Sequence, residues 1–434
     1  MFMKVDVILG LQWGDEGKGK IVDLFTPHYD IIARFQGGPN AGHTIIFDNR
    51  KFVLHSIPSG IFHPESENVV GNGVIIDPFV FMKEVGELAA AGIHAKKNLL
   101  ISHRAHLILP SHRLLDAVYE TQKGHFKIGS TLKGIGPAYT DKYGRNGLRF
   151  GCITQANFSE HYNALKEQHF EAIRNNNADT SQYRFEGLDF QEYEQKWLDA
   201  VEQMKSFRSI DTEQFINKSL DDGKSVLAEG AQGSLLDIDF GSYPYVTSSN
   251  TIAAGACAGL GISPHRIGRI YGIFKAYCTR VGSGPFPTEL SDGIGEQLRA
   301  RGKEFGATTG RPRRCGWLDL PALKYAITLN GVDSLIMMKV DVLDSFKTIK
   351  VCKEYRRNNV LVDEFPFDLE DPELEIVYEE RKGWNSTLEN ISSFGDIPME
   401  LSDYIKYIEN EVGVPVDIVS IGPDRNQTLS RIEL

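Results

Sequence analysis

Gly14-Asp15-Glu16-Gly17-Lys18-Gly19-Lys20 is a glycine-rich stretch that directly follows the first apolar run of the chain, Val5-Asp6-Val7-Ile8-Leu9. An apolar strand, a glycine-rich turn and then a helix form the arrangement that points backbone N–H groups at a phosphate. The stretch fits G-x-x-x-x-G-K, but Ile21 occupies the position where a P-loop carries the Ser or Thr that binds magnesium. If a metal-bound nucleotide binds here, Asp15 is the nearest candidate to hold the metal. The alternative is a glycine-rich turn with two solvated lysines.

The composition is that of a globular protein with an acidic surface. The chain has 434 residues, of which 41% are hydrophobic and 24% charged, and its formal net charge is −11. This charge argues against a general nucleic-acid binder, whose footprint would be basic. The length is typical of roughly two or three domains. Because no repeat or low-complexity linker divides the chain, we treat residues 1–434 as a single α/β domain.

The sequence contains no signal for secretion, membrane insertion or a metal-binding cysteine cluster. The five cysteines are widely spaced without a C-x-x-C pair, which indicates reduced thiols rather than a zinc site or a disulfide framework. The charged N-terminal residues 1–6 are typical of a first strand and not of a signal peptide. No apolar run reaches the roughly 18 residues that a membrane span needs. We therefore expect a cytoplasmic protein without a membrane partner.

Short β-rich runs alternate with helical patterns, which predicts a large, mostly parallel central sheet flanked by helices, similar to P-loop NTPases. Asp77-Pro78 begins an amphipathic helix that closes at Gly92. Residues 158–220 are polar and helix-rich, so we interpret them as a helical excursion from the sheet, with a break at 175–177. The clearest strand candidates are residues 98–102, 225–228, 267–274, 334–340 and 416–421.

Two further glycine-dense loops could approach a ligand closely with their backbone. The first spans 35–44 after the apolar pair Ile31-Ile32, and its His43 is a candidate proton donor near a phosphate. The second spans 133–137, with Thr131 before it and Arg145 after it. A loop histidine taken alone is more often a surface residue, so His43 needs support from its surroundings.

Amide and hydroxyl side chains cluster in residues 229–234 and 243–250, the first of which follows a predicted strand. Such groups suit a neutral heterocycle or a phosphate monoester. They also suit ordinary turn capping, which is the default interpretation for any one of them.

Three arginines lie within four positions of Thr308-Thr309-Gly310-Arg311-Pro312-Arg313-Arg314. These cations repel one another unless anions neutralise them, and guanidinium groups bind carboxylate or phosphate bidentately. A solvated basic loop is the alternative, but in an acidic chain an anion site is the better interpretation.

Lys339-Val340-Asp341 ends the apolar run 335–338. A carboxylate at a strand end can accept from both N1–H and the 2-amino group of guanine. Adenine has no donor at either position, so a buried Asp341 would be left unpaired by ATP. A single K-x-D is weak evidence without the phosphate loop elsewhere in the chain.

Taken together, these segments resemble the adenylosuccinate synthetase family, whose members use GTP to join IMP to aspartate in purine nucleotide synthesis. The resemblance extends from Leu9 to Arg425 and shows no departure at a functional position. The segments that carry it are QWGDEGKGK at 12–20, GGPNAGHT at 37–44, GSGPFPTE at 282–289 and TTGRPRR at 308–314.

The resemblance implies a role for each matching residue. Asp15 is the general base that removes the N1 proton of IMP, His43 donates a hydrogen bond to the transferred phosphoryl oxygens, and Lys18 and Gln232 complete the catalytic set. The implied GTP-binding residues are Gly14, Glu16, Gly17, Lys18, Gly19, Lys20, Gly42, His43, Thr44, Arg313, Lys339, Val340, Asp341, Ser420, Ile421 and Gly422. The implied IMP-binding residues are Asp15, Lys18, Asn40, Ala41, Gly42, His43, Thr131, Arg145, Gln232, Thr247 and Arg311. The implied aspartate-binding residues are Ala307, Thr308, Thr309, Gly310, Arg311 and Arg313.

The resemblance also implies a cofactor, partners and a reaction path. A single Mg²⁺ per subunit is held by Asp15 and the backbone carbonyl of Gly42, and GTP is the co-substrate. Phosphorylation of IMP at O6 gives 6-phosphoryl-IMP, from which the amine of aspartate displaces phosphate. Arg145 reaches the IMP phosphate of a partner subunit, so a homodimer completes the site.

Three other functions remain compatible with parts of the sequence. A regulatory GTPase could use the 14–20 loop and Asp341, but it leaves the arginines at 311–314 without a role. Another ATP- or GTP-dependent ligase could act on a different carboxylate. A nucleotide-binding scaffold without catalysis would make the joint presence of Asp15 and His43 accidental.

Overall fold

The structure is a computed structural model that describes residues 3–40, 42–47, 50–306, 310–362 and 364–433. Its centre is a sheet in which ten strands of the described chain pair, and every neighbouring pair is parallel except the edge pair of β19 and β20. From one edge to the other, the strands are β20 (Thr428–Ser430), β19 (Val416–Ser420), β15 (Ser334–Met338), β11 (Ile267–Lys275), β1 (Val5–Gly10), β10 (Val226–Gly233), β2 (Ile31–Arg34), β5 (Glu67–Val70), β7 (Leu99–Ser102) and β9 (Arg208–Ile210). The predicted mostly parallel α/β sheet is confirmed.

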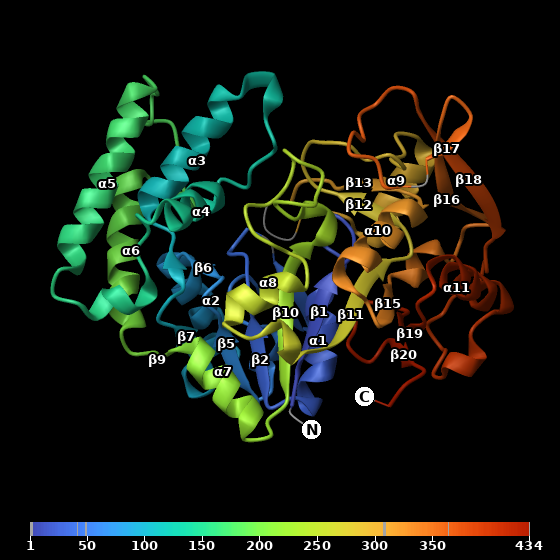
Figure 1. Cartoon of the computed structure of the whole chain (residues 1–434), viewed down its shortest axis with the longest axis horizontal. Coiled ribbons are helices and arrows are strands. Elements are labelled where there is room, and N and C mark those ends of the chain that lie inside the picture. The colour runs from blue at the N-terminus through green and yellow to red at the C-terminus, as the bar shows by residue number, and fades with distance from the viewer. Residues whose placement is uncertain (1–2, 41, 48–49, 307–309, 363, 434) are drawn as a thin grey trace.

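Helices flank this sheet, and further elements lie to its left and to its right in Figure 1. The helices are α1 (Lys18–Phe25), α2 (Pro78–Ala90), α3 (Pro110–Gln122), α4 (Ile135–Gly144), α5 (Phe158–Asn175), α6 (Phe190–Met204), α7 (Thr212–Asp221), α8 (Ala254–Leu260), α9 (Gly293–Gly302), α10 (Leu320–Asn330) and α11 (Met399–Val412). Helices α3 to α6 gather at the left of Figure 1, beyond β7. The side chain of Asp77 caps α2 by accepting from the N–H groups of Phe79 and Val80, as the sequence predicts.

Smaller sheets complete the fold. Strand β16 (Thr348–Arg357) pairs with β14 (Leu318–Asp319), β17 (Val360–Val362) and β18 (Leu374–Lys382) at the right of Figure 1. The two-stranded pairs are β3 (His43–Phe47) with β4 (Arg50–Leu54), β6 (Ile75–Ile76) with β8 (His106–Leu107), and β12 (Cys278–Arg280) with β13 (Arg314–Gly316).

The excursion at 158–220 is mainly helical, and α5 ends at Asn175, within the predicted break. The segment also contains β9, which lies between α6 and α7 and pairs with β7. Strand β9 is three residues long and mostly exposed, so it carries no apolar run that would mark it as a strand.

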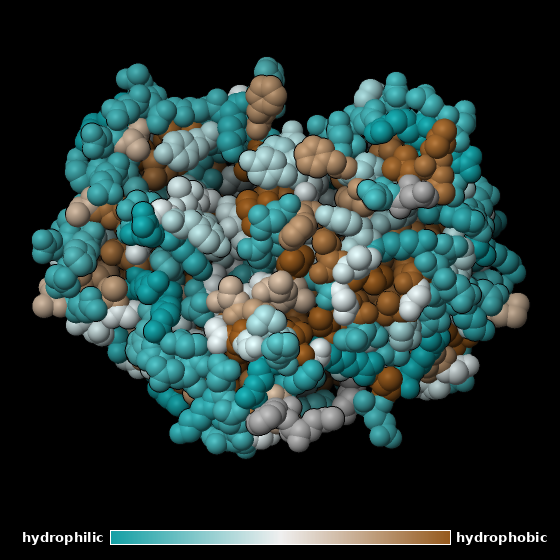
Figure 2. All heavy atoms as spheres, in the orientation of Figure 1, coloured by the Kyte–Doolittle hydropathy of each residue, from teal (hydrophilic) through white to brown (hydrophobic). Residues whose placement is uncertain are grey.

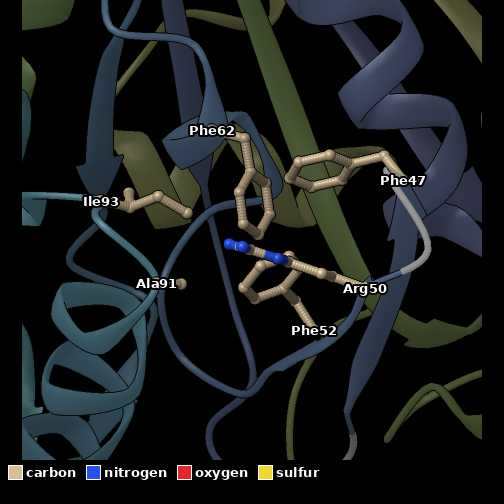
Figure 3. A pocket seen from close by; sticks show the side chains of 6 residues that line it. All are labelled: Phe47, Arg50, Phe52, Phe62, Ala91 and Ile93. Carbon is tan, nitrogen blue, oxygen red and sulfur yellow. The ribbon is translucent and has the colours of Figure 1, made fainter.

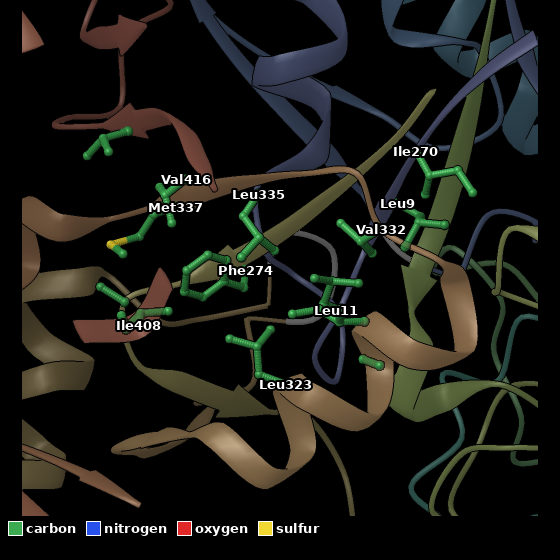
Figure 4. Packing of buried hydrophobic residues seen from close by; sticks show 14 of the residues in the cluster. Leu9, Leu11, Ile270, Phe274, Leu323, Val332, Leu335, Met337, Ile408 and Val416 are labelled. Atoms are coloured by element: carbon green, nitrogen blue, oxygen red, sulfur yellow. The ribbon is translucent and has the colours of Figure 1, made fainter. Parts of the chain in front are cut away.

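The central strands are buried along their whole length because helices cover both faces of the sheet. On one face, Leu323 of α10 and Ile408 of α11 pack with Phe274 and Met337 in the largest hydrophobic cluster (Figure 4). This packing covers β11, which pairs with β1, and β15, which pairs with β11, so the ends of these three strands lie at one edge of the sheet.

The surface matches the acidic, polar composition. In Figure 2 hydrophilic residues cover the flanks of the visible face, while hydrophobic residues show mainly in its middle. All five cysteines are free thiols. None of the helices in the described residues combines the length and the apolar character needed to cross a membrane.

Candidate active site

The expected site segments meet at one edge of the central sheet. Strands β1, β2, β10, β15 and β19 are parallel, so the loops that follow them all leave from their carboxyl ends. In open α/β sheets, this edge is where ligands bind. The loops are those containing residues 11–17, 35–40, 234–236, 339–341 and 421–427.

The phosphate loop after β1 owes its shape to left-handed backbone. Gly14 has φ 85°, Asp15 has φ 59°, and Gly17, the N-cap of α1, has φ 97°. Glycine adopts this region freely, and aspartate tolerates it better than most residues. The loop therefore turns sharply before α1 and leaves the Asp15 side chain 22% exposed.

Glu16 points inward and stabilises the loop. Its buried carboxylate accepts from the N–H groups of Gln12 (3.2 Å) and Gly14 (2.9 Å). It also forms an ion pair with Lys18, whose Nζ lies 2.5 Å from Oε2. The Lys18 ammonium is thus held at the first turn of α1, where a phosphate would bind.

His43, at the start of β3, packs directly on α1. A Cβ built on Gly19 would lie 2.9 Å from the Cβ of His43, so the glycine allows this contact. His43 Nδ1 lies 2.6 Å from Glu229 Oε1, and Glu229 also accepts from the N–H (2.8 Å) and hydroxyl (2.6 Å) of Ser59. The Nε2 atom is buried without a hydrogen-bond partner. Burial lowers the pKa of His43, although Glu229 acts in the opposite direction.

Asp15 and Arg313 join the phosphate loop to the arginine-rich segment. Arg313 Nε lies 2.7 Å from Asp15 Oδ2, and Arg313 Nη1 donates to Glu304 Oε2 at 2.5 Å. Glu304 in turn accepts from Lys339 Nζ at 2.7 Å. Residues from three separate segments are therefore tied together by ion pairs.

Lys20 links α1 to the loop after β19. Its Nζ donates to Ser420 Oγ (2.8 Å) and to the carbonyl oxygens of Gly422 (2.8 Å) and Gln427 (2.9 Å). Burial lowers the pKa of Lys20 to about 7, with Asp341 acting in the opposite direction. Burial likewise raises the pKa of Asp341.

Gln232 and Asn40 meet on the other side of the phosphate loop. Gln232, at the end of β10, has φ 58° and donates through Nε2 to Asn40 Oδ1 at 3.0 Å. Gln232 Oε1 and Thr247 Oγ1 are buried without a hydrogen-bond partner. Because buried polar atoms are nearly always paired, these two acceptors fit a ligand-binding role.

For the remaining expected residues that the structure describes, it gives a position but no contact that indicates a role. Thr131 precedes α4, and Arg145 follows α4 as an exposed residue with φ 65°. Arg311 and Gly310 are exposed. Four further expected residues are sequence neighbours of residues described above. Gly42 and Thr44 flank His43, Val340 follows Lys339, and Ile421 follows Ser420. The expected residues Ala41, Ala307, Thr308 and Thr309 lie outside the described residues.

No sequence motif predicts a role for Glu229 or Glu304. Glu229 is a fully buried carboxylate in β10, and a charged residue within an apolar strand is a signal that could have identified it. Glu304 lies between α9 and the arginine-rich segment in an ordinary polar context, so no local pattern distinguishes it.

One group in the described residues resembles a metal site but does not fit one. His112 Nε2 and His169 Nε2 lie 2.7 and 2.8 Å from the same oxygen of Asp141. However, His112 Nδ1 accepts from the N–H of Leu109 at 2.9 Å, so the ring proton sits on Nε2. A metal-bound histidine has the opposite arrangement, with its remote nitrogen donating. The group is better described as a carboxylate that accepts from two imidazoles.

A pocket of about 370 Å³ lies away from these residues, at the tip of the β3–β4 hairpin (Figure 3). Its walls include Phe47, Phe52 and Phe62, with Arg50 beside them. His43 is at the opposite end of the hairpin, where it pairs with Leu54. The pocket therefore belongs to the packing of the hairpin tip and holds none of the expected site residues.

The fold, together with the phosphate loop at the carboxyl edge of the central sheet, defines a class of protein, the P-loop-like nucleotide-binding α/β proteins. In this chain, positively charged side chains lie on both sides of the phosphate loop. The model of the adenylosuccinate synthetase family matches residues 7–429. The chain is 58% identical to adenylosuccinate synthetase of Parabacteroides distasonis and 57% identical to that of Christiangramia forsetii, each over 99% of this chain and at least 99% of the relative. A solved structure of fully ligated adenylosuccinate synthetase from Plasmodium falciparum superposes with a TM-score of 0.89, at 37% identity over 99% of this chain and 100% of that one.

The chain belongs to the adenylosuccinate synthetase family. Members of this family are GTP-dependent ligases that join IMP and aspartate to form adenylosuccinate. A cyanophage S-2L succinoaminodeoxyadenylate synthetase, 21% identical with a TM-score of 0.63 over 100% of this chain, shares the fold.

Proposed function

We propose that this chain performs the family reaction at the edge described above, with Asp15 as the general base. The observation that carries the proposal is the Asp15–Arg313 ion pair, because it joins the phosphate loop to the segment expected to bind aspartate. The substrates are then IMP, GTP and L-aspartate, and the products are adenylosuccinate, GDP and phosphate.

The proposed chemistry has two steps. Removal of the N1 proton of IMP by Asp15 places negative charge on O6, which attacks the γ-phosphorus of GTP and gives 6-phosphoryl-IMP. The amine of aspartate then attacks C6, and phosphate leaves with the C–O bonding pair. Phosphoryl transfer needs mainly positioning and charge neutralisation, which Lys18 and the N–H groups of the phosphate loop can supply.

Opening the Asp15–Arg313 ion pair would free both oxygens of the proposed base. In the structure Arg313 Nε faces Asp15 Oδ2 at 2.7 Å, so this oxygen becomes available to IMP or to the metal when Arg313 takes another partner. The carboxylates of aspartate, or phosphate oxygens, are suitable new partners for Arg313 because guanidinium binds both bidentately. Ligand binding on the arginine side would thus release the base.

His43 is suited to stabilise the transferred phosphoryl group. Its Nδ1 faces the Glu229 carboxylate, which leaves Nε2 as the atom available to a ligand. An anionic phosphoryl oxygen near Nε2 favours the protonated ring, so that Nε2–H donates as the leaving GDP separates. Gln232 and Thr247 would hold IMP through their unpaired oxygens.

The guanine subsite is proposed at Asp341 and the ends of β15 and β19. The half-buried Asp341 carboxylate can accept from N1–H and the 2-amino group of guanine, whereas adenine would leave it unpaired. The hydrogen bonds of Lys20 to Ser420 and Gly422 support this placement, because they bring α1 to the same loop.

The donor set near the phosphate loop fits Mg²⁺. The Asp15 carboxylate and the backbone carbonyl of Gly42 are oxygen ligands of the kind Mg²⁺ prefers, and Ile21 cannot substitute for them. When bound, the ion would neutralise charge on the phosphate oxygens of GTP.

We further propose a cytoplasmic homodimer in which each subunit acts as one α/β domain. Arg145 supports the dimer, because it is exposed at the end of α4 beside Tyr143, whose surface is 67% exposed. An exposed arginine next to an exposed aromatic residue is typical of an interface. Five free thiols are compatible with a reducing compartment.

A four-component assay tests the proposal. Purified protein is incubated with IMP, GTP, MgCl₂ and L-aspartate, and adenylosuccinate is followed by its absorbance. We expect product only when all four components are present. GTP turnover that is indifferent to IMP would instead favour a regulatory GTPase.

A further inference from the structure

Glu304 is a fully buried carboxylate that touches both sides of the candidate site. Its Oε1 accepts from Lys339 Nζ at 2.7 Å and from the Tyr277 hydroxyl at 2.5 Å. Its Oε2 accepts from Arg313 Nη1 at 2.5 Å. One oxygen therefore faces the proposed guanine side, and the other faces the arginine-rich segment.

Backbone bonds hold this carboxylate in place. The carbonyl of Glu304 accepts from the N–H of Arg313 (2.9 Å), and its own N–H donates to Arg299 at the end of α9 (2.9 Å). Lys339 Nζ also donates to the carbonyl of Gly302, at 2.6 Å. The segment 302–304 thus contacts Lys339 and Arg313 through main chain as well as side chain.

The charges around Glu304 keep it ionised. Burial alone would raise its pKa, but Lys275, Lys339 and Arg313 outweigh burial and hold the pKa well below the usual range. Lys275 is itself fully buried, with Nζ 3.4 Å from Oε1. Removing one partner of a buried charge group leaves the others uncompensated, so this arrangement is sensitive to a change at Glu304.

Arg313 has two carboxylate partners, Asp15 and the fully buried Glu304. When the ion pair with Asp15 opens, the 2.5 Å bond to Glu304 still fixes the guanidinium. The Glu304 carboxylate also binds Lys339. A shift of Lys339 toward a ligand would therefore move Glu304, and with it the bond that Glu304 makes to Arg313.

We propose that Glu304 is a positioning residue that couples the guanine side of the site to the aspartate side. The inference rests on the proposed function, together with the roles that the family resemblance implies for Lys339 in binding GTP and for Arg313 in binding GTP and aspartate. Glu304 itself touches no substrate. It sets the positions of the two cations, so that occupancy of one side changes affinity on the other.

Glu304→Gln tests the positioning role, because it keeps the shape but turns an amide N–H₂ toward a cation. We expect the KM values for GTP and aspartate each to rise by about tenfold, with the KM for IMP changed by less than about twofold. The matched control is Asp319→Asn, another buried carboxylate, which caps α10 and accepts from Tyr355. Asp319→Asn is expected to lower the melting temperature without this split between substrates.

A double-mutant cycle tests the coupling. In the native background, Lys339→Met should raise the KM for aspartate as well as for GTP, because the carboxylate loses one anchor. In the Glu304→Gln background, Lys339→Met should change only the KM for GTP. An aspartate effect of equal size in both backgrounds would overturn the coupling.

If Glu304→Gln does not fold, Tyr277→Phe provides the second test. It removes one hydrogen bond to Oε1 without removing a charge, and it should raise both KM values in the same direction by about two- to threefold. Unchanged KM values for GTP and aspartate in Tyr277→Phe would refute the proposal. Wild-type protein that makes no adenylosuccinate would refute the proposed function instead, and the two failures are therefore distinguishable.

Discussion

Asp15 combines a left-handed backbone conformation with an ion pair to Arg313, and both features shape the first prediction. Asp15→Asn should lower kcat by at least about 100-fold, because the amide can neither take the N1 proton nor supply a charged metal ligand. Asparagine tolerates φ 59°, so the melting temperature should change little. Steady-state kinetics at saturating substrates, with circular dichroism as the control for folding, measure both. A loss below about tenfold would contradict the role of base.

Glu229 leads to a second prediction at the same scale. Glu229→Gln should lower kcat by about ten- to 100-fold, because His43 loses the carboxylate that favours its protonated form. The KM for aspartate should stay unchanged, since this pair lies on the phosphoryl side of the site. Ser59→Ala is the matched control, because it removes one hydrogen bond to Glu229 and leaves the His43–Glu229 pair. Equal losses in the two variants would argue against a role for this pair in phosphoryl transfer.

Individual elements differ in how far the sequence predicts them. The phosphate loop is contained in seven consecutive residues, and its glycines mark the turn. Strands β10 and β15 each contain an apolar run, so the sequence predicts their positions. Strand β10 continues five residues past its predicted end at 228, to Gly233, and β15 ends at Met338, two residues before its predicted end. The sequence does not predict strand β18, because five of its nine residues are acidic or basic and it is only half-buried.

The sequence predicts the position of a site residue when that residue directly follows a strand of the central sheet. It does not predict contacts between side chains that come from different loops. Parallel strands bring their carboxyl ends together, so the sequence could place Lys339 near the phosphate loop. The bonds of Glu304 to Arg313 and Lys339 join residues from different loops, and no spacing in the chain encodes them. The functional roles of these residues remain proposals.

The junction of α3, α4 and α5 gives a prediction about stability and pH. Burial lowers the pKa of His112 to about 4, although its hydrogen bond to Asp141 acts in the opposite direction. In the unfolded chain a histidine titrates near 6.5, so between about pH 6.5 and 4 the unfolded state binds the extra proton. The free energy of unfolding should therefore fall as the pH falls through this window, by up to about 1.4 kcal/mol per pH unit from this residue.

Urea denaturation of the wild type and of His112→Gln, from pH 7 to pH 4, measures how the free energy of unfolding depends on pH. Glutamine can still donate to Asp141 but does not titrate, so the slope of unfolding free energy against pH should become shallower by up to one proton. Exposed His125→Gln controls for the loss of a histidine. A slope that is identical in His112→Gln and the wild type would exclude His112 as the source.

The whole molecule provides a test of the proposed homodimer. If Arg145 completes the site of the partner subunit, Asp15→Asn and Arg145→Leu are inactive for reasons that lie in different subunits. A mixed dimer then has one site with both defects and one intact site. Mixing the two inactive variants should restore activity to about a quarter of the wild-type value, as random pairing of subunits in a two-fold dimer predicts. Mixing that restores no activity, when native mass spectrometry shows mixed dimers, would place Arg145 outside the partner's site.

Asp15, Gln232 and Lys339 all adopt positive φ, between 58° and 61°, at the edge where the substrates are proposed to bind. For residues other than glycine this conformation costs about 1 kcal/mol each. A directed-evolution library screened for heat tolerance alone would therefore favour glycine at these three positions. Each such gain would remove a side chain that we propose the reaction uses, so thermal selection and catalytic selection should diverge here. A screen that alternates the two criteria is the appropriate design for engineering this enzyme.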